Sequence, residues 1–264
     1  MAGRAKIYIF HIFRRDGSSL FLHPLYPPEK IVEMLESAPL EGRYGREPRV
    51  EALTSFRDEL YRQIENGVRR WLADARFIPK FLIAALLFVV TYFFFSFVVR
   101  DPLPVIDEVV LGVAAAVAYF ILQGRRDLAS KRAVKKRLDL RQLVDRVMFR
   151  ESDFIKQVEA ALHGIETESG EELVRRITEP ARQELGEPYR EEAAQLIRML
   201  ESRFNFHRLE REERAWRRKV ERAIPAGASN RRSANFSRLL ESKKYDFPMY
   251  AVYKSFKRTF AGLK

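Results

Sequence analysis

The feature that most constrains this sequence is a run of 19 residues without a charged side chain, at residues 81–99. Folded as an α-helix, the run is about 28 Å long, which matches the hydrocarbon thickness of a lipid bilayer. A buried helix of a soluble domain is rarely this long and this uniformly apolar. The run therefore predicts a transmembrane helix.

A second apolar run follows after a short connection, and its length decides how often the chain crosses the membrane. Its uncharged part, residues 109–122, would form a helix of about 21 Å, which is too short to span. Beginning the helix at Leu103 gives about 30 Å and places Asp107 and Glu108 about one turn inside it. Pro104 suits the first turn of a helix, and both carboxylates then lie near the positive end of the helix dipole and the headgroup layer.

The charges around the two runs favour a hairpin with both ends on one side. Eleven Lys/Arg lie within about 15 residues of the outer ends, whereas the connection between the runs holds Arg100 alone. Cationic residues concentrate on the cytoplasmic side of membrane proteins. We therefore expect a multi-pass protein with two helices, in the cell inner membrane, with both termini in the cytoplasm. The eleven residues are Arg69, Arg70, Arg76, Lys80, Arg125, Arg126, Lys131, Arg132, Lys135, Lys136 and Arg137.

We predict a mainly α-helical protein with a two-helix transmembrane hairpin, a helical cytoplasmic domain and a small N-terminal β-hairpin. The β-hairpin is expected at residues 6–23, where β-branched and aromatic residues flank a polar turn. The predicted segments are an N-terminal cytoplasmic segment (1–77), the transmembrane hairpin (78–124) and a C-terminal cytoplasmic helical domain (125–264). The two cytoplasmic segments are expected to fold together, because an isolated β-hairpin is marginally stable in water.

Periodicity and capping signals place further helices in the cytoplasmic segments. Ser169 and Glu172 have the spacing of a capping box, which predicts a helix beginning at this point. Residues 249–256 fit a helix or a strand, and the Gly-, Pro- and Arg-rich residues 39–49 are expected to form a loop. Helices are also predicted at residues 29–37, 50–77, 127–162, 189–224 and 236–241.

Charge is distributed unevenly over the C-terminal segment. Residues 125–150 carry a net charge of +7, residues 151–202 carry −7, and residues 203–264 carry +11. The last block interleaves aromatic residues with Lys/Arg, which suits docking on anionic lipid headgroups, packing against the acidic block, or nucleic-acid binding. No nucleic-acid-binding motif accompanies it, so we expect docking on the anionic cytoplasmic leaflet. The candidate lipid-binding residues are Arg217, Arg218, Lys219, Arg222, Lys254, Lys257 and Arg258.

The first turn of the second membrane helix allows two interpretations of Asp107 and Glu108. In an oligomer, their carboxylates would form a ring at the mouth of a cation pore. In the simpler interpretation, they form a polar helix start at the lipid headgroups. Glu108 shares a helix face with Gly112 and Ala116, whose small-xxx-small spacing predicts close packing against another helix.

No residue pattern predicts catalysis or a cofactor. Glu159, His163 and Glu166 have a spacing that would suit a divalent metal on a continuous helix, but Gly164 is expected to end that helix first. The sequence has no cysteine, which excludes thiolate chemistry. It also has no phosphate-binding glycine loop and no nucleophile-elbow motif. We therefore predict no catalytic residue, no metal site and no cofactor.

Together these features predict an integral membrane scaffold or adaptor that presents a charged helical domain to a protein partner or to the membrane surface. Homo-oligomerisation of the hairpin fits the same sequence. The alternative is an oligomeric ion channel or transporter subunit with Asp107 and Glu108 near the pore mouth. A membrane-tethered enzyme is a third candidate, although no catalytic motif supports it.

Overall fold

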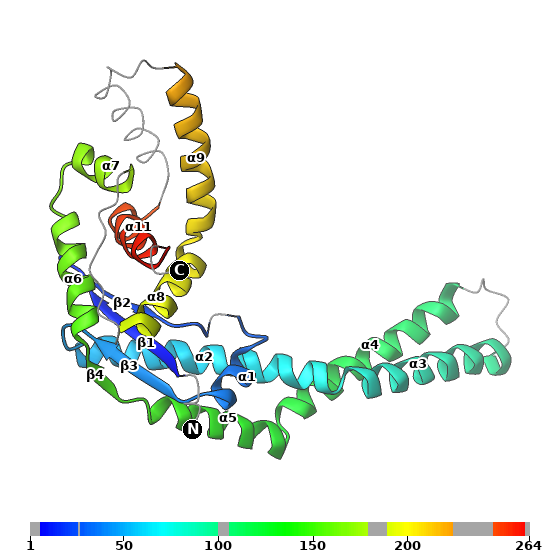
Figure 1. Ribbon diagram of the computed structural model, residues 1–264. Helices are drawn as coiled ribbons and strands as arrows, with labels where there is room; N and C mark the ends of the chain where they lie inside the picture. The colour runs from blue at the N-terminus through cyan, green and yellow to red at the C-terminus, as the bar shows by residue number, and fades with distance from the viewer. Residues whose placement is uncertain (1–5, 26, 100–105, 179–188, 224–244, 262–264) are drawn as a thin grey trace. The chain divides into compact units, whose positions relative to one another are not determined.

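The computed structural model describes residues 6–25, 27–99, 106–178, 189–223 and 245–261 (Figure 1). The chain forms two compact units, and each unit combines segments that are distant in the sequence. Unit 1 comprises Met1–Pro24, Pro39–Phe56 and Val147–Lys264, and unit 2 comprises Leu25–Ala38 and Arg57–Arg146. The expected segments 1–77 and 125–264 each contribute residues to both units, whereas segment 78–124 lies within unit 2.

Unit 1 contains a four-stranded sheet made of β1 (Ile7–Phe13), β2 (Ser19–Leu22), β3 (Leu40–Tyr44) and β4 (Phe149–Glu151). The strand order is β2-β1-β3-β4. β1 pairs antiparallel with β2, with Phe10 opposite Leu22, which confirms the N-terminal β-hairpin. β3 runs parallel to both β1 and β4. Since parallel strands need long crossovers, this sheet joins parts of the chain that are far apart in sequence.

Strand β3 lies in the stretch at 39–49 for which a loop was predicted, so that prediction is wrong for its first half. Gly and Glu have low strand propensity, but β1 and β4 supply hydrogen-bond partners for the β3 backbone on both sides. Gly42 is needed for packing, because a Cβ at this position would lie 2.5 Å from the Phe149 ring. Tertiary pairing therefore overrides local propensity here.

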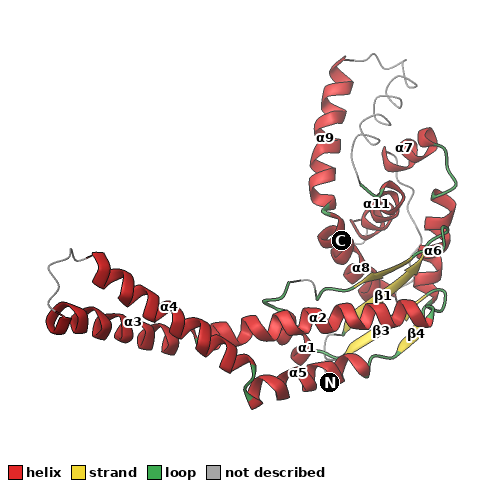
Figure 2. Ribbon diagram, turned by 180° about the vertical axis from the view of Figure 1, so that it is seen from behind, coloured by secondary structure: helices red, strands yellow, loops and turns green. Residues whose placement is uncertain are grey.

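The helices described in unit 1 are α6 (Asp153–Ile165), α7 (Gly170–Thr178), α8 (Arg190–Phe204), α9 (Phe206–Ala223) and α11 (Phe247–Ala261). α6 and α8 pack on β1, and α11 contacts α6, α7 and α8 (Figure 1, Figure 2). Large side chains fill the core between these elements, and Phe10, Phe154, Phe206 and Tyr253 are among those fully buried. This helical layer covers the face of β1 that carries Tyr8, Phe10 and Ile12. On the other face, His11 contacts Phe21, which stacks on Phe56 of α2 (Val50–Ala75).

Local signals set several helix boundaries. The capping box is confirmed, because the Ser169 N–H donates to Glu172 Oε2 at 3.0 Å and the Glu172 N–H donates to Ser169 Oγ at 3.4 Å. Residues 249–256, which fitted a helix or a strand, lie in α11. The single helix predicted at 189–224 is wrong, because Asn205, with a left-handed φ of 54°, divides this stretch into α8 and α9. The helix predicted at 236–241 lies outside the described residues.

The single long helix predicted at 127–162 is wrong. The chain forms α5 (Lys131–Asp145), β4 and α6 over this stretch. Ser130 is the N-cap of α5, and its Oγ accepts a hydrogen bond from the Ala133 N–H at 3.3 Å, which gives α5 a start of its own. β4 then pairs with β3, so tertiary contacts again interrupt a stretch free of Gly and Pro.

Unit 2 contains α1 (Ile31–Ser37), most of α2 (Val50–Ala75), α3 (Phe77–Phe94), the π-helical turn η1 (Phe95–Val99), α4 (Ile106–Leu128) and α5. α1 and α2 confirm the helices predicted at 29–37 and 50–77. Their buried residues include Ile31 and Ile64. Gly67 permits the contact between the two helices, because a Cβ at this position would overlap the Ile31 side chain.

α3 and α4 lie side by side as a helical hairpin (Figure 1, Figure 2). Among the described residues, two stretches are long and apolar enough to cross a membrane: Phe77–Phe97, with 21 residues, and Asp107–Leu128, with 22 residues. At about 1.5 Å per residue they are roughly 32 and 33 Å long, which matches a bilayer core. These two helices agree with the two runs recognised in the sequence.

Candidate functional site: the α3–α4 hairpin and its charged base

The hairpin exposes apolar side chains over most of its length. Only 11% of the apolar window in α3 and 6% of that in α4 is buried. A core helix of a soluble domain would bury these side chains, since each Å² of apolar surface left in water costs about 25 cal/mol. The surface of the hairpin therefore suits a hydrocarbon environment. Its most exposed large apolar residues include Ile78, Leu82, Leu86, Phe97, Val110 and Leu122.

α3 and α4 approach each other through small side chains. Gly112 of α4 is buried, and a Cβ at this position would lie 2.8 Å from the Phe88 ring and 3.3 Å from the Phe88 carbonyl oxygen. Gly112 and Ala116, selected from the sequence as a packing surface, both face α3 within the hairpin. The absence of a side chain at Gly112 is what allows this close approach.

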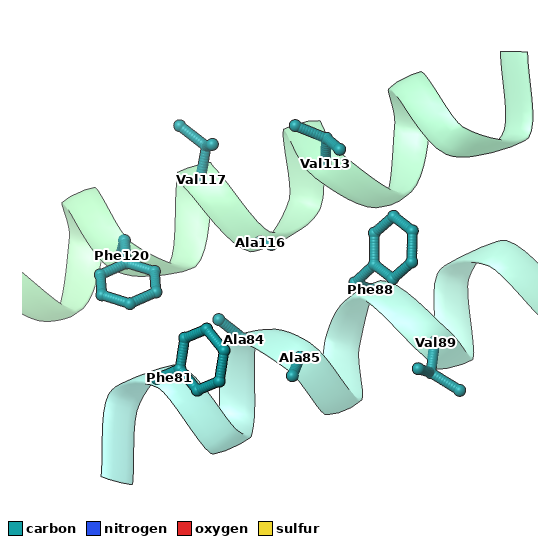
Figure 3. A pocket seen from close by; sticks show the side chains of 9 residues that line it. All are labelled: Phe81, Ala84, Ala85, Phe88, Val89, Val113, Ala116, Val117 and Phe120. Carbon is teal, nitrogen blue, oxygen red and sulfur yellow. The ribbon is translucent and has the colours of Figure 1, made fainter. Parts of the chain in front are cut away.

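An apolar groove of about 340 Å³ lies between the two helices (Figure 3). Ala84, Ala85 and Ala116 leave space in its middle, and phenylalanine rings lie toward its ends (Figure 3). Its lining contains no titratable side chain, so the groove suits contact with hydrocarbon rather than with ions. The lining residues are Phe81, Ala84, Ala85, Phe88, Val89, Val113, Ala116, Val117 and Phe120.

A cluster of charged residues joins α3 to α4 at the base of the hairpin, a name we use for residues 76–80 and 123–131. Asp127 is 2% exposed, and its carboxylate binds Lys80 Nζ at 2.6 Å and the Arg76 guanidinium. Lys80 is 9% exposed, so both members of this pair are largely removed from water. Loss of either partner would leave an uncompensated buried charge, which makes the pair costly to break.

The base of the hairpin carries further cations that form no ion pair with another described residue. Residues 123–137 contain seven Lys/Arg and a single acidic residue, Asp127, whose carboxylate is already held by two cations at the start of α3. Arg125, Arg126 and Lys131 are exposed. None of the three has an ion-pair partner among the residues that the structure describes. Their charge is therefore not compensated by any carboxylate of the described residues.

Farther along α5, cations are engaged within unit 2. The Arg132 guanidinium carbon and Lys136 Nζ lie 5.1 and 5.0 Å from the centre of the Trp71 ring, at cation–π distance. Lys136 also forms an ion pair with Glu36 of α1. Trp71 is thus a packing partner of α5.

Asp107 and Glu108 lie in the first turn of α4, at the end of the hairpin opposite its base. The Asp107 side chain is exposed, and that of Glu108 is partly exposed. Over the described ranges, neither carboxylate has an ion-pair partner. The positive end of the helix dipole stabilises both charges at this position.

Among the candidate lipid-binding residues of the C-terminal block, Arg217 and Lys254 contact Glu213 in unit 1. Glu213 is 2% exposed and lies 2.8 Å from Lys254 Nζ and 2.9 Å from an Arg217 guanidinium nitrogen. The Tyr250 hydroxyl donates to Glu213 at 2.6 Å. Burial and the negative charge of Glu213 raise the pKa of Tyr250. This cluster closes α9 against α11.

A second cluster of the same kind surrounds Lys257. Its Nζ lies 3.1 Å from Glu201 and 2.9 Å from Glu210, while the Tyr253 hydroxyl donates to Glu201 at 2.6 Å. Burial raises the pKa of Tyr253, and its hydrogen bond to Glu201 adds to the shift. Burial alone would raise the pKa of Glu201, but hydrogen bonds from Tyr253 and Lys257 outweigh it and keep this pKa low.

The side chains of only some of the remaining candidate lipid-binding residues are described by the structure. Arg218 and Arg258 are exposed, and the Arg218 Nε–H donates to the Arg214 carbonyl oxygen at 3.3 Å. Lys219 and Arg222 lie in the last turns of α9, and their side chains are outside the described part. The block is thus divided between cations held by glutamates and cations on the surface.

Glu159, His163 and Glu166, which were weighed as metal ligands, connect α6 to the end of β1. Glu159 accepts a hydrogen bond from the Phe13 N–H at 2.8 Å, and His163 Nε2 lies 2.9 Å from the Phe13 carbonyl oxygen. Glu166 binds Arg14 Nε at 2.9 Å. Burial raises the pKa of Glu159, although backbone N–H donors oppose the shift. These contacts give the three residues a role in the fold.

Two buried histidines of unit 1 belong to the core. Burial lowers the pKa of both His11 and His23 to about 4. His11 Nδ1 lies 3.2 Å from the Arg46 carbonyl oxygen, and its ring centre lies 4.8 Å from that of Phe21. Both imidazoles are therefore neutral near pH 7.

Sequence reasoning counted Arg76 and Lys80 as flanking charges, gave Asp127 no role beside them, and missed their cluster. The available signal was the four-residue spacing of Arg76 and Lys80, which places both on one side of a helix. Which residue of α4 they meet depends on how the two helices pack. A comparison of the chain with protein-family models, curated proteins and solved structures finds no match.

Proposed function

We propose that this chain is an integral membrane scaffold or adaptor, anchored in the cell inner membrane by the α3–α4 hairpin, with both termini in the cytoplasm. Unit 1 is the part that it presents to a protein partner or to the membrane surface. The exposed apolar faces of α3 and α4 support membrane insertion, because a bilayer removes them from water.

The observation that carries the proposal is strand pairing between residues on either side of the hairpin in the sequence. β3 precedes α3 and β4 follows α4, yet Gly42 pairs with Phe149 in parallel register. Two strands of one sheet cannot lie on opposite sides of a bilayer, because the backbone between them would cross hydrocarbon unpaired. Two crossings return the chain to the side from which it started, so the sheet supports a hairpin.

The distribution of charge supports the cytoplasm as that side. The base of the hairpin is rich in Lys/Arg, whereas the first turn of α4 at the opposite end carries Asp107 and Glu108. Because segments rich in Lys/Arg stay on the cytoplasmic side of a membrane, the base of the hairpin faces the cytoplasm. Sequence and fold thus support the same topology by independent arguments.

Cysteine accessibility tests this topology. The parent chain has no cysteine, so any label on the chain comes from the introduced residue. Asp74→Cys in α2, Asp139→Cys in α5 and Asp107→Cys in α4 each replace an exposed side chain. We expect a membrane-impermeant thiol reagent to label Asp107→Cys in intact cells. The other two variants should be labelled only after the membrane is permeabilised.

Labelling of Asp74→Cys and Asp139→Cys from opposite sides would contradict the hairpin. Recovery of the parent chain in the soluble fraction would contradict membrane anchoring altogether. Ion conductance by the purified, reconstituted chain that is lost in Asp107→Asn and Glu108→Gln would replace the scaffold proposal with the channel alternative.

A further inference from the structure

We propose that the base of the hairpin is a binding surface for anionic phospholipid headgroups, formed by Arg125, Arg126 and Lys131. The inference rests on the proposed insertion of the α3–α4 hairpin. It moves lipid recognition away from the C-terminal block, to which the sequence assigned it, and onto residues next to the membrane helices.

The position of these cations along α4 suits the headgroup layer. The apolar part of α4 ends at Leu122, and Arg125 and Arg126 follow by three and four residues. At about 1.5 Å per residue, their Cα atoms lie roughly 5–6 Å beyond the edge of the hydrocarbon. The headgroup region adds about 5–8 Å on each side of the core, so both guanidinium groups reach the level of the phosphates.

The electrostatic state of these residues favours an external anion. Asp127 is the single acid within residues 123–137, and Lys80 and Arg76 already hold its carboxylate. Arg125 and Arg126 are exposed beside it, and no acid of the described residues pairs with them. A guanidinium binds a phosphate through two parallel hydrogen bonds, which suits a phosphodiester headgroup.

Lys131 extends the surface by one turn. It is the first residue of α5, directly after the N-cap Ser130, and its side chain is exposed. It follows Arg126 by five positions. An anionic membrane attracts exposed cations within a Debye length of about 8–10 Å, so a cation this close to the end of α4 in sequence can add to the attraction. Each such residue strengthens binding to an anionic surface about fivefold, and three together give a preference of roughly a hundredfold.

The C-terminal block carries the same types of cation, but several of them contact glutamates. Lys254 and Lys257 contact Glu213 and Glu210, so part of the positive charge of this block is offset inside unit 1. Arg217 likewise contacts Glu213. Cations whose charge is already compensated gain less from an anionic lipid than cations without an acidic partner.

Lipid-dependent melting of the full chain in mild detergent tests the inference. A lipid that binds the folded state raises the melting temperature, and its concentration dependence gives an apparent affinity. We expect phosphatidylglycerol to bind the parent chain more tightly than phosphatidylcholine. Arg125→Gln combined with Arg126→Gln should weaken phosphatidylglycerol binding about tenfold or more and leave phosphatidylcholine binding unchanged.

Two control variants show whether the loss of lipid preference comes from these positions, from the lower net charge or from misfolding. Arg217→Gln with Arg218→Gln removes the same charge from the C-terminal block and should leave the lipid preference intact. Arg125→Lys with Arg126→Lys keeps the charge at the base and should retain most of the preference. Its lipid-free melting temperature also shows whether the two positions tolerate substitution.

Three results would overturn the inference. Equal weakening by the two glutamine pairs would assign the preference to net charge alone. Equal stabilisation by inorganic phosphate would indicate a site for free anions rather than for lipid. Equal affinity of the parent chain for the two lipids would remove the preference itself. Failure of the chain to float with neutral vesicles would contradict membrane anchoring, whereas flotation without lipid preference contradicts this inference alone.

Discussion

The base of the hairpin and the C-terminal helices of unit 1 use similar residues with different electrostatic results. Asp127 in α4 and Glu213 in α9 are each 2% exposed, and each binds two cations. Near Glu213, additional glutamates bind the neighbouring Lys257. Near Asp127, Arg125 and Arg126 have no acidic partner among the described residues. The difference shows that neighbouring carboxylates, rather than the number of cations in a segment, decide which charges are available to a partner.

The largest effect is expected from removing the carboxylate at the base of the hairpin. Asp127→Asn leaves Lys80, which is 9% exposed, without its counter-charge. The free energy of unfolding should fall by about 3–5 kcal/mol, the usual cost of breaking a buried ion pair from one side. Chemical denaturation of the full chain in mild detergent measures this change.

Replacing the whole pair serves as the control for that variant. Lys80→Met with Asp127→Leu removes both buried charges and fills similar volume, so its stability should stay within about 1–2 kcal/mol of the parent. A double variant as unstable as Asp127→Asn would show that packing, and not the unpaired charge, accounts for the loss.

A smaller effect is expected at the corresponding carboxylate of unit 1. Glu213→Gln removes the charge that faces Lys254 and Arg217, whose side chains are 18% and 36% exposed and can therefore turn toward water. We expect the free energy of unfolding to fall by about 2 kcal/mol in the same denaturation experiment. Arg218→Gln, on the exposed side of α9, should change it by less than about 0.5 kcal/mol. If Glu213→Gln and Asp127→Asn lower the free energy of unfolding equally, the proposed difference between the two sites is wrong.

An effect comparable to that at Glu213 is expected at the contact that closes the hairpin. Gly112→Leu places a side chain where the Phe88 ring would lie 2.8 Å from its Cβ, so the helices must separate or Phe88 must move. We expect a loss of about 1–3 kcal/mol, as for overpacked cores. Gly124→Leu is the matched control on the same helix, because a Cβ there meets nothing within 4 Å. If Gly112→Leu and Gly124→Leu lower the melting temperature in detergent by the same amount, the Gly112 face packs against lipid rather than against α3.

The elements predicted correctly from the sequence are those that depend on residues close together in the chain. The apolar runs of α3 and α4 are visible because burial in hydrocarbon requires about 20 consecutive residues without charge. The Ser169 capping box and the Asn205 helix boundary show the same dependence on neighbours within a few residues, although only the first was predicted. Polarity and capping act over short distances along the chain.

The amino-acid sequence by itself determined the two membrane-capable helices, the N-terminal β-hairpin and the excess of cations beside the apolar runs. Only the tertiary structure decided that residues 40–44 form a strand, because its backbone partners come from β1 and β4. Only the tertiary structure likewise placed Lys80 against Asp127 and left Arg125 and Arg126 exposed. Backbone pairing and charge compensation depend on groups that are distant in sequence, and folding brings those groups together.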